Sequence, residues 1–276
     1  KFYVLQNTPL KWNIDANISF NRNRIGGLKA DQFAQKLWSS ADEVFIQRNG
    51  CPIGAIYGYV EDGFYDNLAE VMASPSADIR AKGAGMIGEI KYRNFDDNPD
   101  ITSADRVIIG DTNPDFVYGL TSNFEWKGVT LSFFLQGSQG NDIFNGNLMD
   151  MKMGNVGNIT REAYNTRWTE ANATQAKWPK AVSGYERNML ISNRYVEDGS
   201  YLKLKSLNIG YVWKPNFKGI SNVNVYASAT NLFTITGYSW FDPEVNAFGS
   251  DASRRGVDVY SYPSSRTFSL GIKVDF

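Results

Sequence analysis

The sequence predicts an all-β protein, a transmembrane antiparallel β-barrel, from three observations. Several stretches alternate between apolar and polar residues, most clearly the closing stretch Arg266–Phe276. Successive side chains of a strand point to opposite faces, so this stretch has one apolar and one polar face, as a strand between lipid and lumen requires. The connections between such stretches are short at one end and long at the other. Aromatic residues make up 14% of the chain.

Strands are expected at about residues 1–6, 10–24, 116–126, 129–137, 199–213, 222–236 and 265–276. The second has a polar face made almost entirely of Asn, Asp and Ser, which suits bulk water or a wet lumen. In the third expected strand, 116–126, the apolar face is interrupted only by Ser122. Lys127–Gly128, directly after it, is expected to form a tight hairpin turn. The alternation in 199–213 changes phase near Ser206, which indicates a β-bulge.

The long connections are 25–115, 138–197 and 239–263. The first should hold a helix over Lys29–Ala41, with Phe33 and Leu37 one turn apart, and short strands at Ile53–Val60 and Gly88–Phe95. Connections of this length are uncommon in compact soluble domains, and outer-membrane barrels have short periplasmic turns and long extracellular loops. The short-turn end also carries the residues of an interfacial aromatic girdle, Trp12, Trp126, Trp213 and Phe276. A single alternating stretch would fit the edge strand of a soluble β-sandwich equally well, but these features together favour the barrel.

Composition excludes several functional classes. The net charge of −1 offers no electrostatic footprint for nucleic acid, and without histidine the commonest general base and metal ligand are missing. Cys51 is alone, so neither an internal disulfide nor a Cys₄ zinc site can form. Lys1 already lies in strand-like sequence, so we expect the chain to be a fragment of something longer.

One segment has the spacing of a calcium loop. Its candidate oxygen ligands are Asn94, Asp96, Asn98, Asp100 and Asp105. Asn94 removes a charge from the first position, and Pro99 stands where such loops normally have glycine. An Asx-rich surface turn is the alternative, and it is favoured.

Substrate or partner binding is the other candidate role. Aromatic rings on the expected extracellular side could stack on sugars or pack against a protein, or they could pack the loops on one another. These residues are Trp168, Trp178, Tyr185, Tyr238 and Trp240. Asp242 and Glu244 could suggest a glycosidase pair, but they share one face of an extended segment with no evident site between them. No catalytic constellation is present, so the sequence does not predict an enzyme.

Six stretches along the chain match motifs of a known family. They are Cys51-Pro-Ile-Gly-Ala-Ile-Tyr-Gly-Tyr-Val60, Gly110-Asp-Thr-Asn-Pro-Asp-Phe-Val-Tyr-Gly119, Leu135-Gln-Gly-Ser-Gln-Gly-Asn-Asp-Ile-Phe-Asn145, Arg167-Trp-Thr-Glu170, Asp198-Gly-Ser-Tyr-Leu-Lys-Leu-Lys-Ser-Leu-Asn-Ile-Gly-Tyr211 and Asn231-Leu-Phe-Thr-Ile-Thr-Gly-Tyr-Ser-Trp-Phe-Asp-Pro-Glu-Val245. These stretches resemble the SusC-like outer-membrane transporters, a branch of the TonB-dependent receptors found in Bacteroidetes, and they keep the order of the family along most of the chain. The family often has proline where Glu170 stands.

The resemblance implies that residues 1–276 are the carboxy-terminal part of a plugged barrel of the 22-stranded type, without the plug and amino-terminal domains. It implies a place in the outer membrane of a Bacteroidetes-like Gram-negative cell. The expected activity is import of oligosaccharides, or oligopeptides for some members, energised through TonB. The implied partners are a SusD-like surface lipoprotein, TonB through the missing part, the remainder of the barrel and plug, and membrane lipid. The end of the last strand, Phe276, is implied to be the signal for barrel assembly. No cofactor is expected apart from the possible calcium ion.

Two alternatives stay open at this point. One is a passive porin or surface adhesin barrel, which would have no plug and no TonB contact upstream. The other is a secreted carbohydrate-binding β-sandwich or glycosidase, which would be monodisperse in water without detergent, whereas a lipid-facing apolar band should aggregate.

Overall fold

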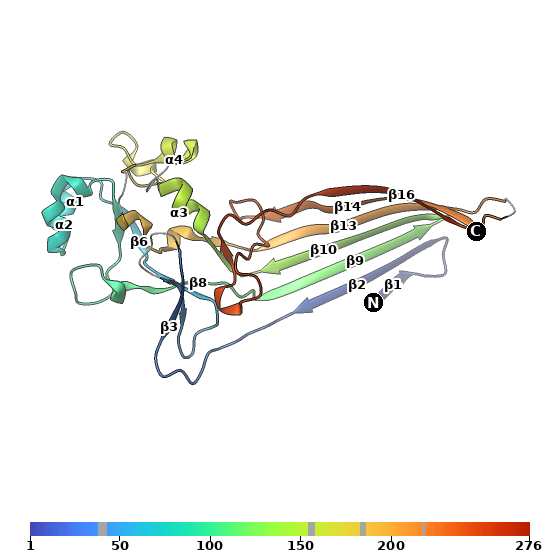
Figure 1. Cartoon of the computed structure of the whole chain (residues 1–276), viewed down its shortest axis with the longest axis horizontal. Helices are drawn as coiled ribbons and strands as arrows, with labels where there is room; N and C mark the ends of the chain where they lie inside the picture. The colour runs from blue at the N-terminus through green and yellow to red at the C-terminus, as the bar shows by residue number, and fades with distance from the viewer. Residues whose placement is uncertain (38–42, 154–157, 183–185, 217–218) are drawn as a thin grey trace.

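A long antiparallel sheet and a folded head at one end of it make up the molecule (Figure 1). The computed structural model describes residues 1–37, 43–153, 158–182, 186–216 and 219–276. The sheet has seven strands in the order β1-β2-β9-β10-β13-β14-β16. Their bounds are β1 Phe2–Leu5, β2 Leu10–Ser19, β9 Phe116–Trp126, β10 Val129–Gln139, β13 Tyr201–Trp213, β14 Asn222–Thr236 and β16 Thr267–Asp275. These strands match the expected stretches, although β2 ends at Ser19 rather than near residue 24.

The register aligns residues of like polarity across the sheet. One row runs through Asn13, Asn123, Ser132, Asn208, Ser228 and Ser269. The Asn13 Oδ1 accepts from Asn123 Nδ2 at 3.0 Å, and Asn123 Oδ1 accepts from Ser132 Oγ at 2.7 Å. A neighbouring row on the opposite face runs through Trp12, Phe124, Leu131, Ile209, Ala227 and Leu270. We call the face with the polar row the lumen face and the face with the apolar row the lipid face.

Ser122 interrupts the lipid face without leaving a polar group unpaired. Its Oγ accepts a hydrogen bond from the indole Nε1 of Trp12 at 2.9 Å, which satisfies a side chain that is otherwise buried. Trp12 also stacks on Phe124, with ring centroids 5.2 Å apart. Trp126, Trp213 and Phe276 are exposed at the short-turn end, so the residues proposed for the aromatic girdle lie at one level of the sheet.

The bulge expected near Ser206 is confirmed and lies at Lys205. Phe134 pairs with Ser206 while Leu135 pairs with Leu204, so both neighbouring strands skip Lys205. The extra residue changes the phase of β13. Below the bulge Leu207 and Ile209 lie on the lipid face, and above it Leu202 and Leu204 do, which places Lys203 on the lumen face.

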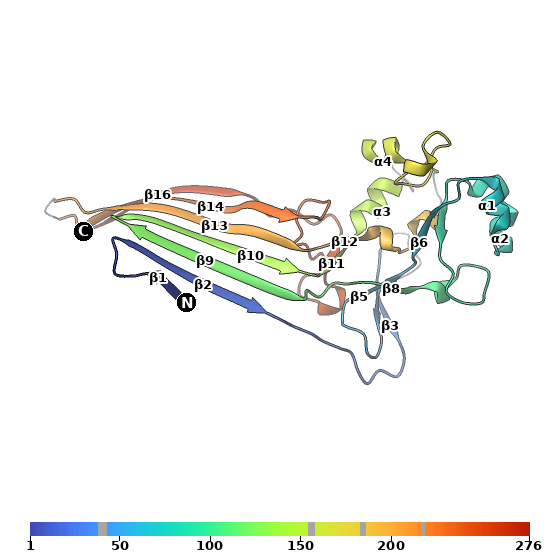
Figure 2. The ribbon, with the colours of Figure 1, turned by 180° about the vertical axis from the view of Figure 1, so that it is seen from behind.

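The three long connections form the head at the opposite end (Figures 1 and 2). Its strands are β3 Gln32–Lys36, β4 Glu43–Gln47, β5 Ala55–Gly58, β6 Glu61–Phe64, β7 Ile90–Tyr92, β8 Val107–Asp111, β11 Asp142–Asn145, β12 Val196–Asp198 and β15 Val257–Asp258. They form sheets in the orders β3-β4-β5-β8, β12-β11-β15 and β6-β7. The helices are α1 Leu68–Ala73, α2 Ala77–Lys82, α3 Gly146–Met153 and α4 Arg161–Thr166. Short 3₁₀ turns cover Gly83–Met86, Ser103–Asp105, Ala173–Gln175, Glu186–Met189, Asn193–Tyr195 and Ala252–Arg254. Among the described residues no helix is long and apolar enough to cross a membrane.

All three connections contribute to one hydrophobic core in the head. It includes Phe45 and Ile56 from the first, Phe144 and Tyr195 from the second, and Val257 from the third, each fully buried. Burying this apolar surface is the main stabilising contribution for segments whose local sequence is irregular. The head is therefore a folded unit, not a set of independent loops.

The helix expected over Lys29–Ala41 is wrong for the part that the structure describes. Residues Gln32–Lys36 form β3, where Phe33 pairs with Ile46 and Ala34 with Phe45. The centre of β4 is fully buried and needs a hydrogen-bonded neighbour, and this tertiary pairing overrides the helical spacing of Phe33 and Leu37. Residues 38–41 of that expectation lie outside the described residues. The short strands expected at Ile53–Val60 and Gly88–Phe95 are present as β5 and β7.

Candidate functional site at the junction of head and barrel

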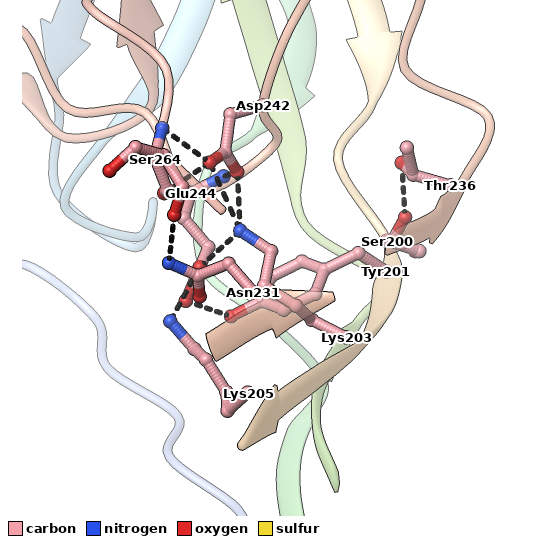
Figure 3. Close-up of polar contacts among 10 residues, drawn as sticks. Ser200, Tyr201, Lys203, Lys205, Asn231, Thr236, Asp242, Glu244 and Ser264 are labelled. Carbon is pink, nitrogen blue, oxygen red and sulfur yellow. Dashed lines mark hydrogen bonds and ion pairs between the residues drawn. The ribbon is translucent and has the colours of Figure 1, made fainter. Parts of the chain in front are cut away.

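A buried ion cluster lies where the third long connection meets the lumen face of β13 (Figure 3). Lys203 is only 2% exposed. Its Nζ lies 2.8 Å and 3.0 Å from the two carboxylate oxygens of Asp242 and 2.5 Å from Glu244 Oε2. Lys205 Nζ lies 2.6 Å from the same Glu244 oxygen. The cluster joins two lysines of a barrel strand to two carboxylates of a loop.

The carboxylates of the cluster are held in their charged form. Burial raises the pKa of Asp242, but hydrogen bonds from Lys203 and Ser264 outweigh it and leave that pKa below its usual value. Burial acts in the same way on the pKa of Glu244, which the two lysines bring below normal. Asp242 and Glu244 are thus fully engaged by ammonium groups, in keeping with a loop-shaping role.

The sequence did not single out Lys203 as a site residue. Its signal was a Lys-x-Lys pair in a strand and an Asp-x-Glu pair in the following loop, with equal spacing and opposite charge. Unbroken alternation would have placed Lys203 on the same face as Leu207. Only the bulge at Lys205 turns it toward the carboxylates.

Two of the nominated tryptophans pack the head. Trp168 is buried against Gly88 and donates from Nε1 to Asp66 Oδ1 at 2.9 Å. Trp178 is buried beneath the guanidinium of Arg194, whose Cζ lies 5.3 Å from the ring centroid. These contacts correspond to the alternative in which the rings pack the loops on one another.

The remaining three nominated aromatics differ among themselves. Tyr238 is buried and donates to Asp258 Oδ2 at 2.6 Å. Trp240 is partly exposed and meets Phe241 edge to face, with centroids 5.2 Å apart. Tyr185 lies outside the described residues.

A pocket of about 520 Å³ brings Trp178 and Trp240 together at the junction of all three connections. Its polar walls are preorganised, because Glu61 pairs with Arg194 at 2.5 Å and Glu197 accepts from the backbone N–H of Ser239 at 2.8 Å. The other lining residues are Leu148, Glu162 and Lys177. Two indoles, three carboxylates and an ammonium group around one cavity could bind a polar ligand that also has an apolar face.

The segment with calcium-loop spacing forms a series of Asx turns. Asp96 N donates to Asn94 Oδ1, Asn98 N to Asp96 Oδ1 and Asp100 N to Asn98 Oδ1, at 3.0, 2.9 and 3.1 Å. Both carboxylate oxygens of Asp105 accept backbone N–H groups, from Phe95 and Thr102. Within the described ranges no group of three His, Cys, Asp or Glu side chains is placed to hold a metal ion. A surface turn accounts for these contacts.

Comparison with known proteins gives the family. The chain is 34% identical to TonB-dependent receptor P3 of Formosa agariphila over 99% of its length, and 26% identical to TonB-dependent receptor SusC of Bacteroides thetaiotaomicron over 96%. The chain is part of a SusC-like TonB-dependent receptor. Such receptors lie in the outer membrane, which agrees with the two faces of the sheet. No family model matches the chain.

Solved structures agree on the fold of this SusC-like segment. It superposes on the RagAB peptide importer in the "open-open" state with a TM-score of 0.72 and 20% identity, over 99% of the segment. The "closed-closed" state gives a TM-score of 0.69 at 21% identity. The segment spans about a quarter of the matched proteins, 27% of the P3 receptor and 27% of the first RagAB chain.

Proposed function

We propose that the receptor containing this segment imports oligosaccharides or oligopeptides across the outer membrane, energised through TonB and paired with a SusD-like surface lipoprotein. The observation that carries the proposal is the head. Three connections from one barrel end share a single core, so they present one preformed surface above a polar lumen face. The similarity to TonB-dependent receptors and to the RagAB peptide importer supports the same class of transporter.

The head has the surface expected for a partner that closes over it. Large hydrophobic side chains are exposed there, and a broad interface of mixed polar and aromatic character suits a contact that must open and close. Among these residues are Leu68, Met72, Tyr164, Phe241 and Tyr262. Arg167 lies over the exposed Tyr164 ring at 3.9 Å, a pair that supplies both an aromatic face and a charge.

The test uses the full-length receptor in its native host. Tyr164→Ala combined with Arg167→Ala, or removal of exposed residues within 138–197, should reduce co-purification of the lipoprotein and growth on the cognate nutrient. The barrel should stay inserted, as judged by heat modifiability on a gel. If both co-purification and uptake remain intact, partner binding lies elsewhere in the receptor.

A second arm separates an active importer from a porin. Uptake by the unmodified receptor should be lost in cells without TonB, because the barrel alone supplies no energy. Uptake that continues without TonB would contradict the proposal and identify a passive channel.

A further inference from the structure

The third long connection crosses the barrel mouth on the lumen side. It leaves β14, and its residues Pro243–Asn246 line a pocket together with Val117, Ser138 and Tyr201 from the upper ends of β9, β10 and β13. The turn Ala252–Arg254 lies still farther across, beside the first connection (Figure 1). There the guanidinium of Arg254 donates to Gln35 Oε1 at 3.2 Å. We call residues 239–264 the strap.

The far part of the strap is fixed by backbone pairing. β15 runs parallel to β11, with Val257 opposite Phe144 and Asp258 opposite Asn145. The N–H of Phe144 also donates to Gly256 O at 2.8 Å. This part therefore belongs to the head core and does not depend on the barrel wall.

The near part of the strap is fixed to the barrel wall by side chains. Asp242 accepts from the N–H groups of Glu244 and Ser264 at 3.0 and 3.1 Å, so one carboxylate closes the loop on itself. The Nζ of Lys203 then donates to both oxygens of this carboxylate. On the other side of the cluster, Tyr201 donates to Glu244 Oε1 at 3.0 Å (Figure 3).

Lys203 and Lys205 contribute unequally to this attachment. Lys203 is buried and contacts both carboxylates, whereas Lys205 is partly exposed and contacts only Glu244. Loss of the buried partner would leave the Asp242 charge desolvated and without a cation, which is strongly unfavourable. Loss of Lys205 would leave both carboxylates still paired with Lys203.

We propose that Lys203 is a positioning residue that holds the strap against the lumen wall and so sets the width of the passage through the barrel mouth. The attachment itself is independent of what the receptor carries. Its consequence for transport rests on the proposed import function.

Hydrogen–deuterium exchange of the purified full-length receptor tests the attachment. In Lys203→Met the amides of Glu244 and Ser264 should exchange about tenfold faster or more, because the strap opens locally, while β14 and β16 peptides keep their protection. Lys205→Met is the matched control and should produce a much smaller change. Equal effects of the two variants, or unchanged exchange in Lys203→Met, would overturn the proposal.

Asp242→Asn covers the case in which Lys203→Met fails to insert, and a double-mutant cycle tests the pairing when both variants insert. Asp242→Asn lies in the strap rather than in a barrel strand, and it should speed the same amides. Lys203→Met with Asp242→Asn should be no worse than Lys203→Met alone, because the stranded charge is gone. Additive effects of the two substitutions would show that they act separately and would refute the attachment.

Uptake measurements address the consequence. With the strap released, the apparent KM for the cognate nutrient should rise several-fold while the maximal rate is largely kept, because a wall of the passage is displaced but the energised step is intact. An unchanged KM despite faster exchange would refute the role in transport and leave the attachment standing. Absence of uptake by the unmodified receptor would instead count against the proposed function.

Discussion

Buried charges mark the places where separate segments of this chain meet. Besides Lys203, the clearest is Glu89, which is fully buried in the head and lies 3.4 Å from Lys180 Nζ. Burial raises the pKa of Glu89 above its usual value even though Lys180 opposes the shift. The folded head therefore favours the protonated acid and loses stability as pH rises through that pKa.

Two substitutions at this ion pair should differ in their effects. Lys180→Met leaves a buried carboxylate without its cation and should destabilise the head by about 1–3 kcal/mol at neutral pH. Glu89→Gln removes the buried charge, so stability should be unchanged or higher, and its decline with rising pH should disappear. Thermal unfolding of the detergent-purified receptor at several pH values measures both. A larger loss in Glu89→Gln than in Lys180→Met would contradict this account.

Single residues were the level at which sequence predicted least. Because Trp168 and Trp178 lie in long connections, the sequence makes them candidates for binding, yet the head buries both. Whether a loop tryptophan faces solvent depends on contacts between connections far apart in sequence, such as Trp168 with Asp66. The Asx turn from Asn94 to Asp100, by contrast, follows from local spacing and was recognisable in advance.

At the scale of the element, β16 shows how alternation determines orientation. Phe268, Leu270 and Ile272 are strongly exposed on the lipid face, where Leu270 is 89% accessible. Lys273 lies on the lumen face, in register with Asn224, and its Nζ is 3.2 Å from Asp275. The strand has a clear division between its faces even though it is a sheet edge in this segment.

Substitutions on the two faces of β16 should have different costs in the full-length receptor. Leu270→Arg places a charge in hydrocarbon and should cost about 2–4 kcal/mol near the midplane. Lys273→Gln keeps a polar side chain on the lumen face and should be tolerated. Urea unfolding in lipid vesicles compares them, and equal losses would mean that the faces are assigned incorrectly.

Elements with a strict two-residue period were predictable and others were not. The seven barrel strands follow from alternation, because the hydrogen-bond register repeats the same polarity across every neighbour. The stretch Gln32–Lys36 does not alternate strictly, and Gln35 adopts a left-handed φ of 67°. The edge of β4 that this stretch pairs with, and not the sequence of the stretch, decides that it forms a strand.

At the scale of the whole molecule, the sheet has two open edges, β1 and β16. An open edge with unpaired N–H and C=O groups is not stable in hydrocarbon, so both edges need strands that the segment does not itself provide. The matched chains are about four times longer, which leaves room for those strands. The head, in contrast, has its own core and needs no such partner to bury Phe45 or Tyr195.

Assembly of the complete barrel gives the prediction at this scale. We expect that deletion of Phe276, which is 91% exposed at the end of the chain, lowers outer-membrane abundance of the full-length receptor several-fold. The reason is that the resemblance to the SusC-like family implies that the barrel-assembly machinery reads the end of this strand. Heat-modifiability gels quantify the folded fraction, with Phe276→Tyr as a conservative control. Undiminished abundance after the deletion would remove Phe276 from any role in assembly.

The bulge at Lys205 also affects which changes in chain length β13 tolerates. An in-frame loss of this codon would remove the bulge without turning any other side chain over, because Leu204 and Leu207 would still lie on the lipid face with Ser206 between them on the lumen face. A one-residue deletion between Leu207 and Trp213 would instead turn the residues on one side of it to the opposite face. A deletion of three nucleotides should therefore do less damage at the Lys205 codon than in the regular part of the same strand.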